Sequence, residues 1–485
     1  MPQQHLHRRA PWLFAGRLVA ATIVGPEWVQ AQRPLDRAAL AVTHVTVIDV
    51  AGGATHPDQT LVVVGNRIAR LGPSATTLPP RGASVVDASG AFVMPGLWDM
   101  HVHLFRHSGS PPADVHERYF PLFLANGVTG VRDMWTTLED RLTLLAWRRD
   151  EATGALPGPR IVGSSTIVDG PKSIWAAAIH VANAVQARRV VDSLAQGGAE
   201  FIKVYTDLGR DAYFAIAAHT KRLGLPFAGH LPFSVTAAEA SDAGQKSIEH
   251  LGFTDDCSMA RDQIVRLRLD PSLPRPAGGV AQLYLSTYSD SMCGVLFRRF
   301  VQNGTWQVPT LVVHRMAGLT FDDARTLGVR MQYITPEERA TWEQRIRPGS
   351  PQAAETRRKV FQRDLDIVAL MQRAGVPVLA GSDVANPWLI AGYSLHDELA
   401  LFVQAGMSPL AALQTATINP ARYLGALDSL GTVVEGKIAD LVLLDANPLE
   451  DVRNVDRIRA VVANGRLLTR AALDSLLVTA RQRTR

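Results

Sequence analysis

Apolar and polar residues alternate at both ends of the chain in the way that predicts β-strands. The pattern covers residues 39–87, where Gly65-Asn66 is a hairpin turn signal, and it returns near the C-terminus. Its strand-like runs are 41–50, 60–68, 431–433, 439–445 and 460–466. We therefore predict one small β-sandwich domain that is assembled from both chain ends, over residues 36–92 and 426–475.

The middle of the chain, residues 93–425, has a different pattern. Apolar runs of four to eight residues are followed by stretches rich in Ala, Leu and Arg that are typical of helices. Eight such runs are strand candidates: 92–98, 127–132, 160–163, 201–205, 226–229, 246–249, 306–313 and 376–380. Strands that alternate with helices predict an α/β fold with a parallel sheet, and eight units predict a (β/α)₈ TIM-type barrel. The long segments 254–300 and 315–375 are expected to be lids or insertions.

Composition and charge narrow the class of protein. The chain has 485 residues, of which 47% are hydrophobic and 20% charged, as in ordinary soluble globular proteins. The net charge of +5 comes without a basic stripe interleaved with aromatic residues, so nucleic-acid binding is not expected. Cys257 and Cys293 could form one disulfide or be two unrelated thiols, and neither lies in a Cys-x-x-Cys motif.

The first 35 residues resemble a targeting segment. A basic start at His7-Arg8-Arg9 is followed by the apolar run 18–25 and by small residues near Ala31. We expect a signal peptide and export to the periplasm or medium; the alternative is a disordered extension of a cytoplasmic protein. No later run has the length of a membrane span, so the mature chain is expected to be soluble, with a small-molecule substrate. The sequence leaves open whether it forms a homo-oligomer.

Candidate metal ligands follow several of the predicted strands. His101 and His103 are two residues apart on the first strand, so both imidazoles should point to the same side. Active sites of (β/α)₈ barrels lie at the carboxyl ends of their strands. At the other strand ends we find Lys203, His230, His250 and Asp383. His230 and Asp383 could equally cap helices. Lys203 is harder to explain, because a buried ammonium group is costly unless it is paired or neutral.

The ordered set of motifs resembles the amidohydrolase superfamily, and within it the imidazolonepropionase-like branch that contains metal-dependent prolidases. The resemblance covers most of residues 40–467. Its motifs are PGLWDMHVH at 95–103, FIKVY at 201–205, GHLP at 229–232, SIEH at 247–250, AGSD at 380–383, NPA at 419–421 and GKIADLVL at 436–443.

The resemblance implies a site with two divalent metal ions, usually zinc. His101, His103 and Asp383 would hold one ion, and His230 and His250 the other. Lys203 would bridge both ions after its amine reacts with carbon dioxide to form a carbamate. The carbamate is an anion with two oxygens, whereas a protonated amine would repel the metals. Branch members that bind a single metal lack this lysine.

Such a site predicts a hydrolase of C–N bonds. Two metals acidify a shared water to a bridging hydroxide, and one of them can polarise the carbonyl of an amide or peptide. Asp383 would then move the proton to the leaving amine. Tyr205, two residues from Lys203, could bind the substrate oxygen. The other residues that we considered, with a structural role as the alternative, are His314, Arg315, His396, Trp388 and the pair Arg132-Asp133.

The substrate expected from the resemblance is a dipeptide or an N-acyl amino acid, as for a prolidase. A single-metal deaminase or cyclic-amide hydrolase is the alternative, and it predicts activity that survives the loss of Lys203. A third alternative is a catalytically silent binding or assembly module, which would be expected to have lost ligands, whereas all six are present.

Overall fold

The computed structural model describes residues 39–105, 112–317, 327–345 and 350–484. The predicted signal peptide, residues 1–35, lies outside them. Within the described ranges no helix is both long and apolar enough to cross a lipid bilayer. The domain boundaries given above stay predictions.

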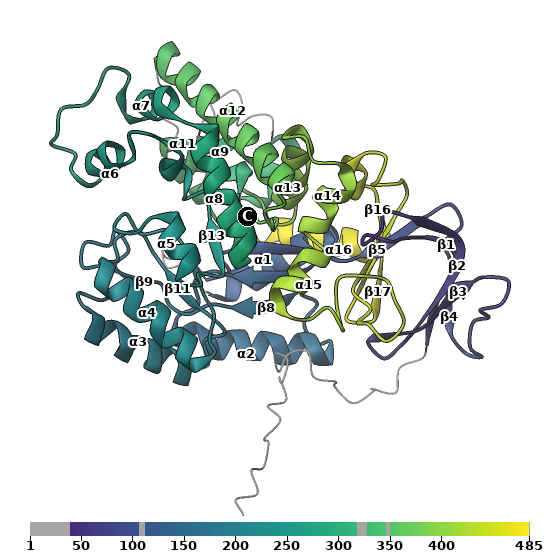
Figure 1. Cartoon of the computed structure of the whole chain (residues 1–485). Helices are drawn as coiled ribbons and strands as arrows, with labels where there is room; N and C mark the ends of the chain where they lie inside the picture. The colour runs from purple at the N-terminus through teal and green to yellow at the C-terminus, as the bar shows by residue number, and fades with distance from the viewer. Residues whose placement is uncertain (1–38, 106–111, 318–326, 346–349, 485) are drawn as a thin grey trace, which may run out of the picture.

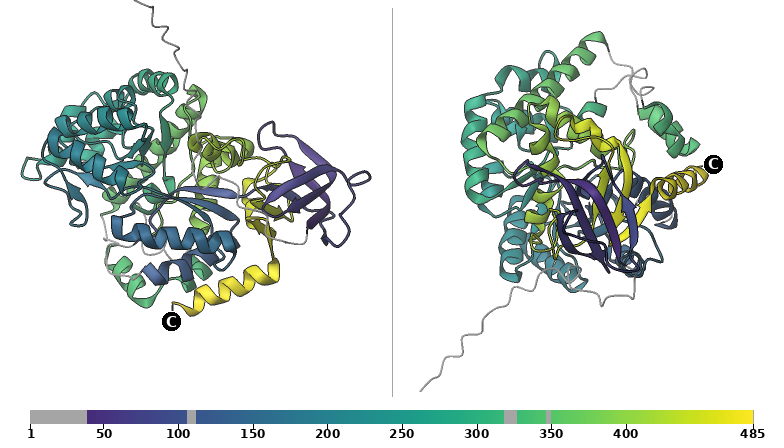
Figure 2. Two further views of the ribbon diagram at one scale, coloured as in Figure 1. Left: turned by 90° about the horizontal axis from the view of Figure 1, so that it is seen from below. Right: turned by 90° about the vertical axis from the view of Figure 1, so that its right-hand side faces the viewer.

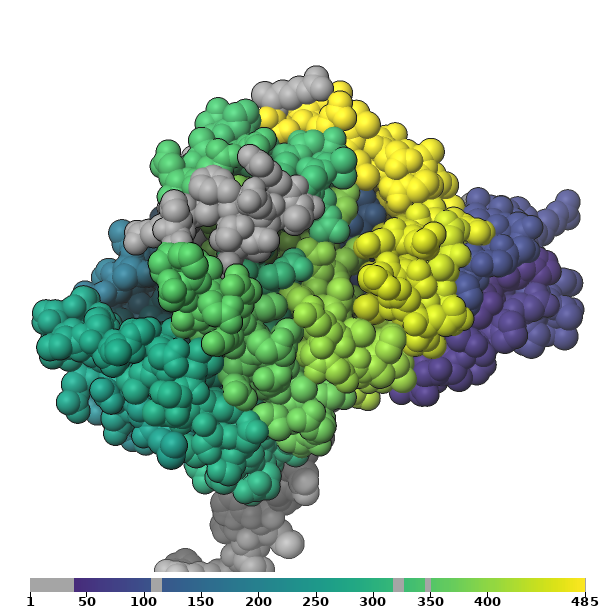
Figure 3. Space-filling model, turned by 90° about the horizontal axis from the view of Figure 1, so that it is seen from above, coloured from purple at the N-terminus to yellow at the C-terminus, as the bar shows by residue number. Residues whose placement is uncertain are grey.

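Strands from the two chain ends form one mixed sheet of eight strands, in the order β17-β16-β15-β5-β1-β2-β3, with β4 beside β1. Figures 1 and 3 show these N-terminal and C-terminal segments side by side. The turn between β2 and β3 contacts the turn between β16 and β17, because the Asn66 side-chain amide donates a hydrogen bond to Asn464 Oδ1 at 3.0 Å. The strands are β1 (Leu40–Ile48), β2 (Thr55–Val64), β3 (Arg67–Pro73), β4 (Ser84–Asp87), β5 (Phe92–Pro95), β15 (Leu441–Leu444), β16 (Ile458–Ala463) and β17 (Arg466–Thr469). A β structure built from both ends is thus confirmed.

Parallel strands from the middle of the chain form the barrel that the sequence predicts. They lie in two arcs, β6-β7-β8 and β10-β9-β11-β12-β13-β14. Backbone hydrogen bonds from Ser165 to Phe201 (2.9 Å), from Leu379 to Gln307 (2.9 Å) and from Met100 to Ala380 (2.9 Å) connect the arcs. The strands are β6 (Leu97–Val102), β7 (Val128–Asp133), β8 (Arg160–Gly163), β9 (Val168–Asp169), β10 (Ile179–His180), β11 (Ile202–Val204), β12 (Phe227–Gly229), β13 (Ser247–Glu249) and β14 (Trp306–Val308).

The predicted run 431–433 forms no strand, and three of the predicted barrel strands also need correction. The run 92–98 is two strands: β5 belongs to the end sheet, and β6 begins the barrel after Gly96. A Cβ at Gly96 would lie 2.0 Å from Thr129 Oγ1, so the chain can turn there only with glycine. The run 306–313 ends its strand at Val308. The run 376–380 makes only one bridge, between Gln307 and Val378, partly because Pro377 has no N–H to donate.

Helices cover the barrel. α1 (Pro112–Ala125), α2 (Leu138–Thr153), α3 (Ala184–Gln196), α4 (Arg210–Leu223) and α5 (Ala237–Asp242) alternate with the strands. The predicted insertions hold η2 (Thr254–Cys257), α6 (Arg261–Leu269), α7 (Gly279–Thr287), α8 (Asp290–Asn303), α9 (Leu311–Ala317), η3 (Gly328–Tyr333), α11 (Pro336–Arg345) and α12 (Pro351–Ala374). The other helices of the described residues are α13 (Tyr393–Gln404), α14 (Pro409–Thr415), α15 (Ile418–Leu424), η4 (Val452–Asp456) and α16 (Arg470–Gln482). Figure 2 shows α16 along the outside of the barrel, where it packs against α1.

Cys257 and Cys293 form a disulfide, which settles the alternative left open by the sequence. It links η2 to α8 across a sequence separation of 36 residues, and both cysteines are fully buried. The bond therefore joins the first helical turn after β13, η2, to α8, the last helix of the same insertion.

Removing this disulfide with Cys257→Ala and Cys293→Ala together is expected to lower the free energy of unfolding by about 4 kcal/mol, because closing a loop of this length restricts the unfolded chain. Urea denaturation of the oxidised wild type and of the double variant measures the difference. Equal urea midpoints would contradict the prediction.

Candidate metal centre

β6 and the residue directly after it place the first two candidate ligands at the carboxyl end of the barrel. The His101 and His103 ring centroids are 5.4 Å apart. Both rings face one carboxylate: Asp383 Oδ1 lies 3.4 Å from His101 Nε2 and 3.0 Å from His103 Nε2. The predicted same-side placement of the two histidines is therefore present, with His101 completely buried.

Asp383 reaches this position because the chain before it passes very close to β6. A Cβ at Gly381 would lie 2.8 Å from the His101 Cβ, and the Asp383 N–H donates to the His101 carbonyl at 2.7 Å. Asp383 itself has a left-handed backbone, with φ of 57°. Burial opposes its ionisation, but the nearby His250 and His103 hold the pKa of Asp383 below its usual value. The residue is thus a carboxylate at neutral pH.

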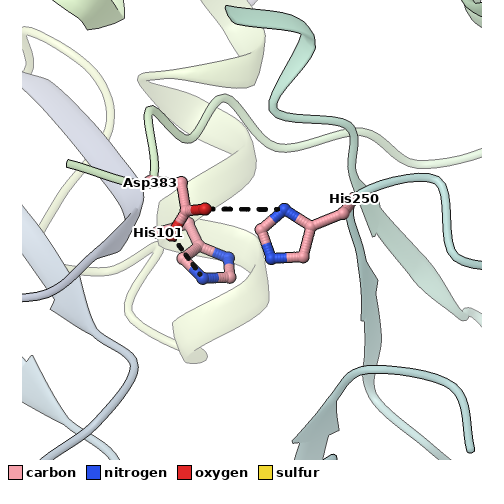
Figure 4. A group of neighbouring side chains, drawn as sticks. All are labelled: His101, His250 and Asp383. Atoms are coloured by element: carbon pink, nitrogen blue, oxygen red, sulfur yellow. Dashed lines mark ion pairs between the residues drawn. The ribbon is translucent and has the colours of Figure 1, made fainter. Parts of the chain in front are cut away.

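His230 and His250 follow β12 and β13 and complete the row of imidazoles. The His250 ring centroid is 4.5 Å from that of His101 and 4.7 Å from that of His230. His250 Nδ1 lies 3.9 Å from Asp383 Oδ2 and 2.7 Å from Thr310 Oγ1. Figure 4 shows His101, His250 and Asp383 pointing toward one another from three separate segments, and one ligand atom from each lies within 4.8 Å of the others.

Lys203 on β11 is fully buried in the same region. Its Nζ has no hydrogen-bond partner among the residues that the structure describes. Burial lowers the pKa of Lys203 to about 8, because an ammonium group is poorly solvated there. The same burial, together with the charge of Lys203, places the pKa values of His101 and His230 well below the usual value.

These features fit a metal site. Neutral imidazoles and a carboxylate are donor types that bind divalent zinc. His101 Nε2 is buried and makes no hydrogen bond among the described residues, so its lone pair is available.

Glu249 fixes the orientation of His101, and the sequence had not identified this role. Its Oε2 lies 2.8 Å from His101 Nδ1, which places the ring proton on Nδ1 and leaves Nε2 toward Asp383. Arg132 donates to both Glu249 oxygens at 3.0 Å, and the Ser247 hydroxyl donates at 2.6 Å. The predicted pair Arg132-Asp133 is wrong: Asp133 instead accepts from the backbone of Leu104 at 2.7 Å.

A second carboxylate missed by the sequence reading supports the Asp383 segment. Asp99 accepts hydrogen bonds from the backbone N–H of Ser382, at 2.9 Å, and from the Ser382 hydroxyl. Burial raises the pKa of Asp99 to about 7. Its only sequence signal was its position in the strand, two residues before His101.

The remaining candidates divide into those at the centre and those outside it. Tyr205 lies at the centre, with its ring centroid 3.9 Å from that of His230. His314 contacts the His250 carbonyl at 3.1 Å and Asp364 at 2.8 Å.

Three candidates serve the surrounding structure. Arg315 pairs with Asp397 at 2.9 Å. His396 lies between Asp456 and the Asn126 carbonyl. Trp388 is buried and its ring packs 5.6 Å from that of Trp342.

A cavity of about 550 Å³ opens beside His230 and His250. Its wall continues from these residues to helices α6, α7 and α12 of the insertions. The cavity thus adjoins the candidate centre at His230 and His250, and its volume is in the range that encloses a drug-sized molecule.

Residues 92–468 match the family model described as "Amidohydrolase family". The chain belongs to the amidohydrolase family. The predicted resemblance to this superfamily and to its imidazolonepropionase-like and prolidase branch is confirmed. This amidohydrolase is 26% identical to the solved structure of bottromycin amidohydrolase, with a TM-score of 0.70 and coverage of 93% of this chain and 91% of that chain.

This amidohydrolase is also similar to one further solved structure over most of its length and to two curated proteins over short segments. The putative prolidase from Bifidobacterium longum is 24% identical, with a TM-score of 0.62 and coverage of 91% and 99%. Adenine deaminase 2 of Jannaschia sp. (strain CCS1) is 44% identical over 55 residues, which are 11% of this chain and 9% of that protein. Imidazolonepropionase of Thermoplasma volcanium is 34% identical over 98 residues, or 20% and 24% of the two chains. The chain therefore spans under a quarter of the length of these two relatives.

Proposed function

We propose that this amidohydrolase cleaves a C–N bond, amide or peptide, with two divalent metal ions, most simply zinc, and that its substrate is a dipeptide or an N-acyl amino acid. The observation that carries the proposal is the group formed by His101, His250 and Asp383 beside Lys203, which is buried and has no hydrogen-bond partner among the described residues. A solvent-excluded lysine amine next to imidazoles has no evident structural purpose, whereas a carbamate formed on that amine would serve as an anionic metal ligand.

The residues present could hold two ions. His101, His103 and Asp383 would bind one, and His230 and His250 the other. The deprotonated form of the Lys203 amine, which a pKa of about 8 makes accessible, would add to carbon dioxide with formation of an N–C bond and release of one proton. The resulting carbamate would be an anionic ligand for both ions. When bound, the metals would acidify a water molecule and polarise the scissile carbonyl.

The chain's own side chains would direct the proton and the substrate oxygen. An Asp383 carboxylate oxygen would accept the proton of the attacking water and pass it to the leaving nitrogen. The Tyr205 hydroxyl would donate a hydrogen bond to the carbonyl oxygen as negative charge develops there. Burial raises the pKa of Tyr205 to about 12, so this hydroxyl keeps its proton at neutral pH.

Elemental analysis of the purified protein, before and after treatment with a chelator, tests this proposal. We expect about two metals per chain, loss of amide hydrolysis by at least about 10³-fold on chelation, and recovery with Zn²⁺, since metal stabilisation of the transition state is worth several kcal/mol. One metal per chain would favour the deaminase or cyclic-amide alternative. Full activity without metal would overturn the proposal.

A further inference from the structure

The outer wall of the cavity beside the candidate centre contains a group of aliphatic side chains. Val265 on α6, Val280 and Ala281 on α7, and Val360 on α12 all line it and are half-buried. Figure 1 shows these helices together on one side of the barrel strands. Three helices that are far apart in sequence thus present small aliphatic side chains to the same space.

The charged residues of the wall are already paired with one another or with residues behind it. Those that the structure describes there, apart from the two proposed ligands His230 and His250, form the contacts His314–Asp364 (2.8 Å), Arg268–Asp255 (3.0 Å), Arg261–Asp256 and Glu249–Arg132 (3.0 Å). A charged group that entered this space would lose its water and gain no unpaired opposite charge from them, which is unfavourable.

Tyr284 on α7 also lines the cavity. The residue is buried, and its hydroxyl is shielded from solvent and has no hydrogen-bond partner among the described residues. This hydroxyl therefore adds no exposed polar group to the wall.

We propose that this cavity selects amides that carry a bulky, uncharged, apolar group on one side of the scissile bond. The inference rests on the proposed C–N hydrolysis and narrows its substrate class. A volume of about 550 Å³ lies in the range that encloses drug-sized molecules, more than the side chains of a small dipeptide need. Because the charged residues of the wall are already paired, a charged substrate group would lose its water there without gaining an ion pair. An uncharged apolar group has no such penalty.

Two series of N-acyl amino acids test the substrate class. One enlarges the acyl side from acetylglycine through benzoylglycine to naphthoylglycine, and the other enlarges the amine side from acetylglycine through acetylphenylalanine to acetylnaphthylalanine. We expect kcat/KM to rise by at least about 10-fold along one series, and a carboxylate added to the distal ring to abolish the rise. A flat or falling trend in both would overturn the inference, while metal-dependent turnover of acetylglycine would keep the proposed function. If the metal-loaded protein hydrolysed no member, both would be wrong.

Narrowing the cavity tests its location. Val280→Trp and Val360→Trp are expected to lower kcat/KM for the largest good substrate by at least about 10-fold and to leave that for acetylglycine nearly unchanged. Val301→Trp on α8, which is 44% exposed and outside the wall, is the matched control and should change neither. Equal losses on both substrates, or no loss on the large one, would contradict the assignment.

Discussion

Replacing Lys203 with methionine is expected to reduce kcat/KM for amide hydrolysis by at least about 10³-fold and to lower the metal content from about two ions per chain to one or none. Methionine is similar in length and apolar, so it suits the fully buried position, but it cannot form the bridging carbamate. Elemental analysis and steady-state kinetics of both proteins, produced with bicarbonate in the medium, measure the two effects.

Lys246 provides the matched control for this substitution. It lies just before β13, and thus at the opposite end of the barrel from the candidate centre, and burial also lowers its pKa to about 8. Lys246→Met should therefore retain both metals and activity. If Lys203→Met kept its metals and its activity, the carbamate bridge would be wrong and a single-metal mechanism would replace it.

The residues that the sequence predicted best are those that follow directly from strand geometry. Parallel strands all end at one face of a barrel, so His101, Lys203 and His230 could be expected together although they lie far apart in the chain. The separation of two residues between His101 and His103 likewise predicts rings on one side.

The supporting contacts could not be predicted, because they depend on departures from regular strands. The left-handed backbone at His250, with φ of 59°, breaks the alternation after β13, so Glu249 and His250 can both face the centre. Neighbouring residues on a strand point to opposite faces, which is why Arg132 pairs with Glu249 and not with the adjacent Asp133. The sequence pattern gives no sign of a partner 117 residues away.

The cavity wall was also beyond sequence reasoning. The segments 254–300 and 315–375 were expected to be lids or insertions, and their helices do lie over the site. Their ion pairs join α6 to η2 and α9 to α12, and such contacts between irregular insertions have no periodic pattern that would reveal them.

Replacing Arg132 with methionine is expected to lower the free energy of unfolding by about 3–5 kcal/mol, because it leaves the buried Glu249 carboxylate without its cation. Arg132 also donates to the Met100 carbonyl at 2.6 Å and to the Tyr423 hydroxyl at 2.8 Å, and both acceptors would lose this partner. Since Glu249 orients His101, metal affinity should fall by about 10–100-fold as well. Urea denaturation and metal titration measure the two effects.

A double-mutant cycle separates the ion pair from simple packing. Glu249→Gln removes the negative charge, so Arg132→Met combined with Glu249→Gln should lose less stability than the sum of the two single variants. Arg149→Met, which removes an exposed ion pair with Asp150, is the control and should have little effect. Strict additivity of the two single variants, or an equal loss of stability in Arg149→Met, would show that Arg132 stabilises the barrel by its bulk alone. The inference that the Arg132–Glu249 ion pair both stabilises the fold and orients His101 would then be wrong.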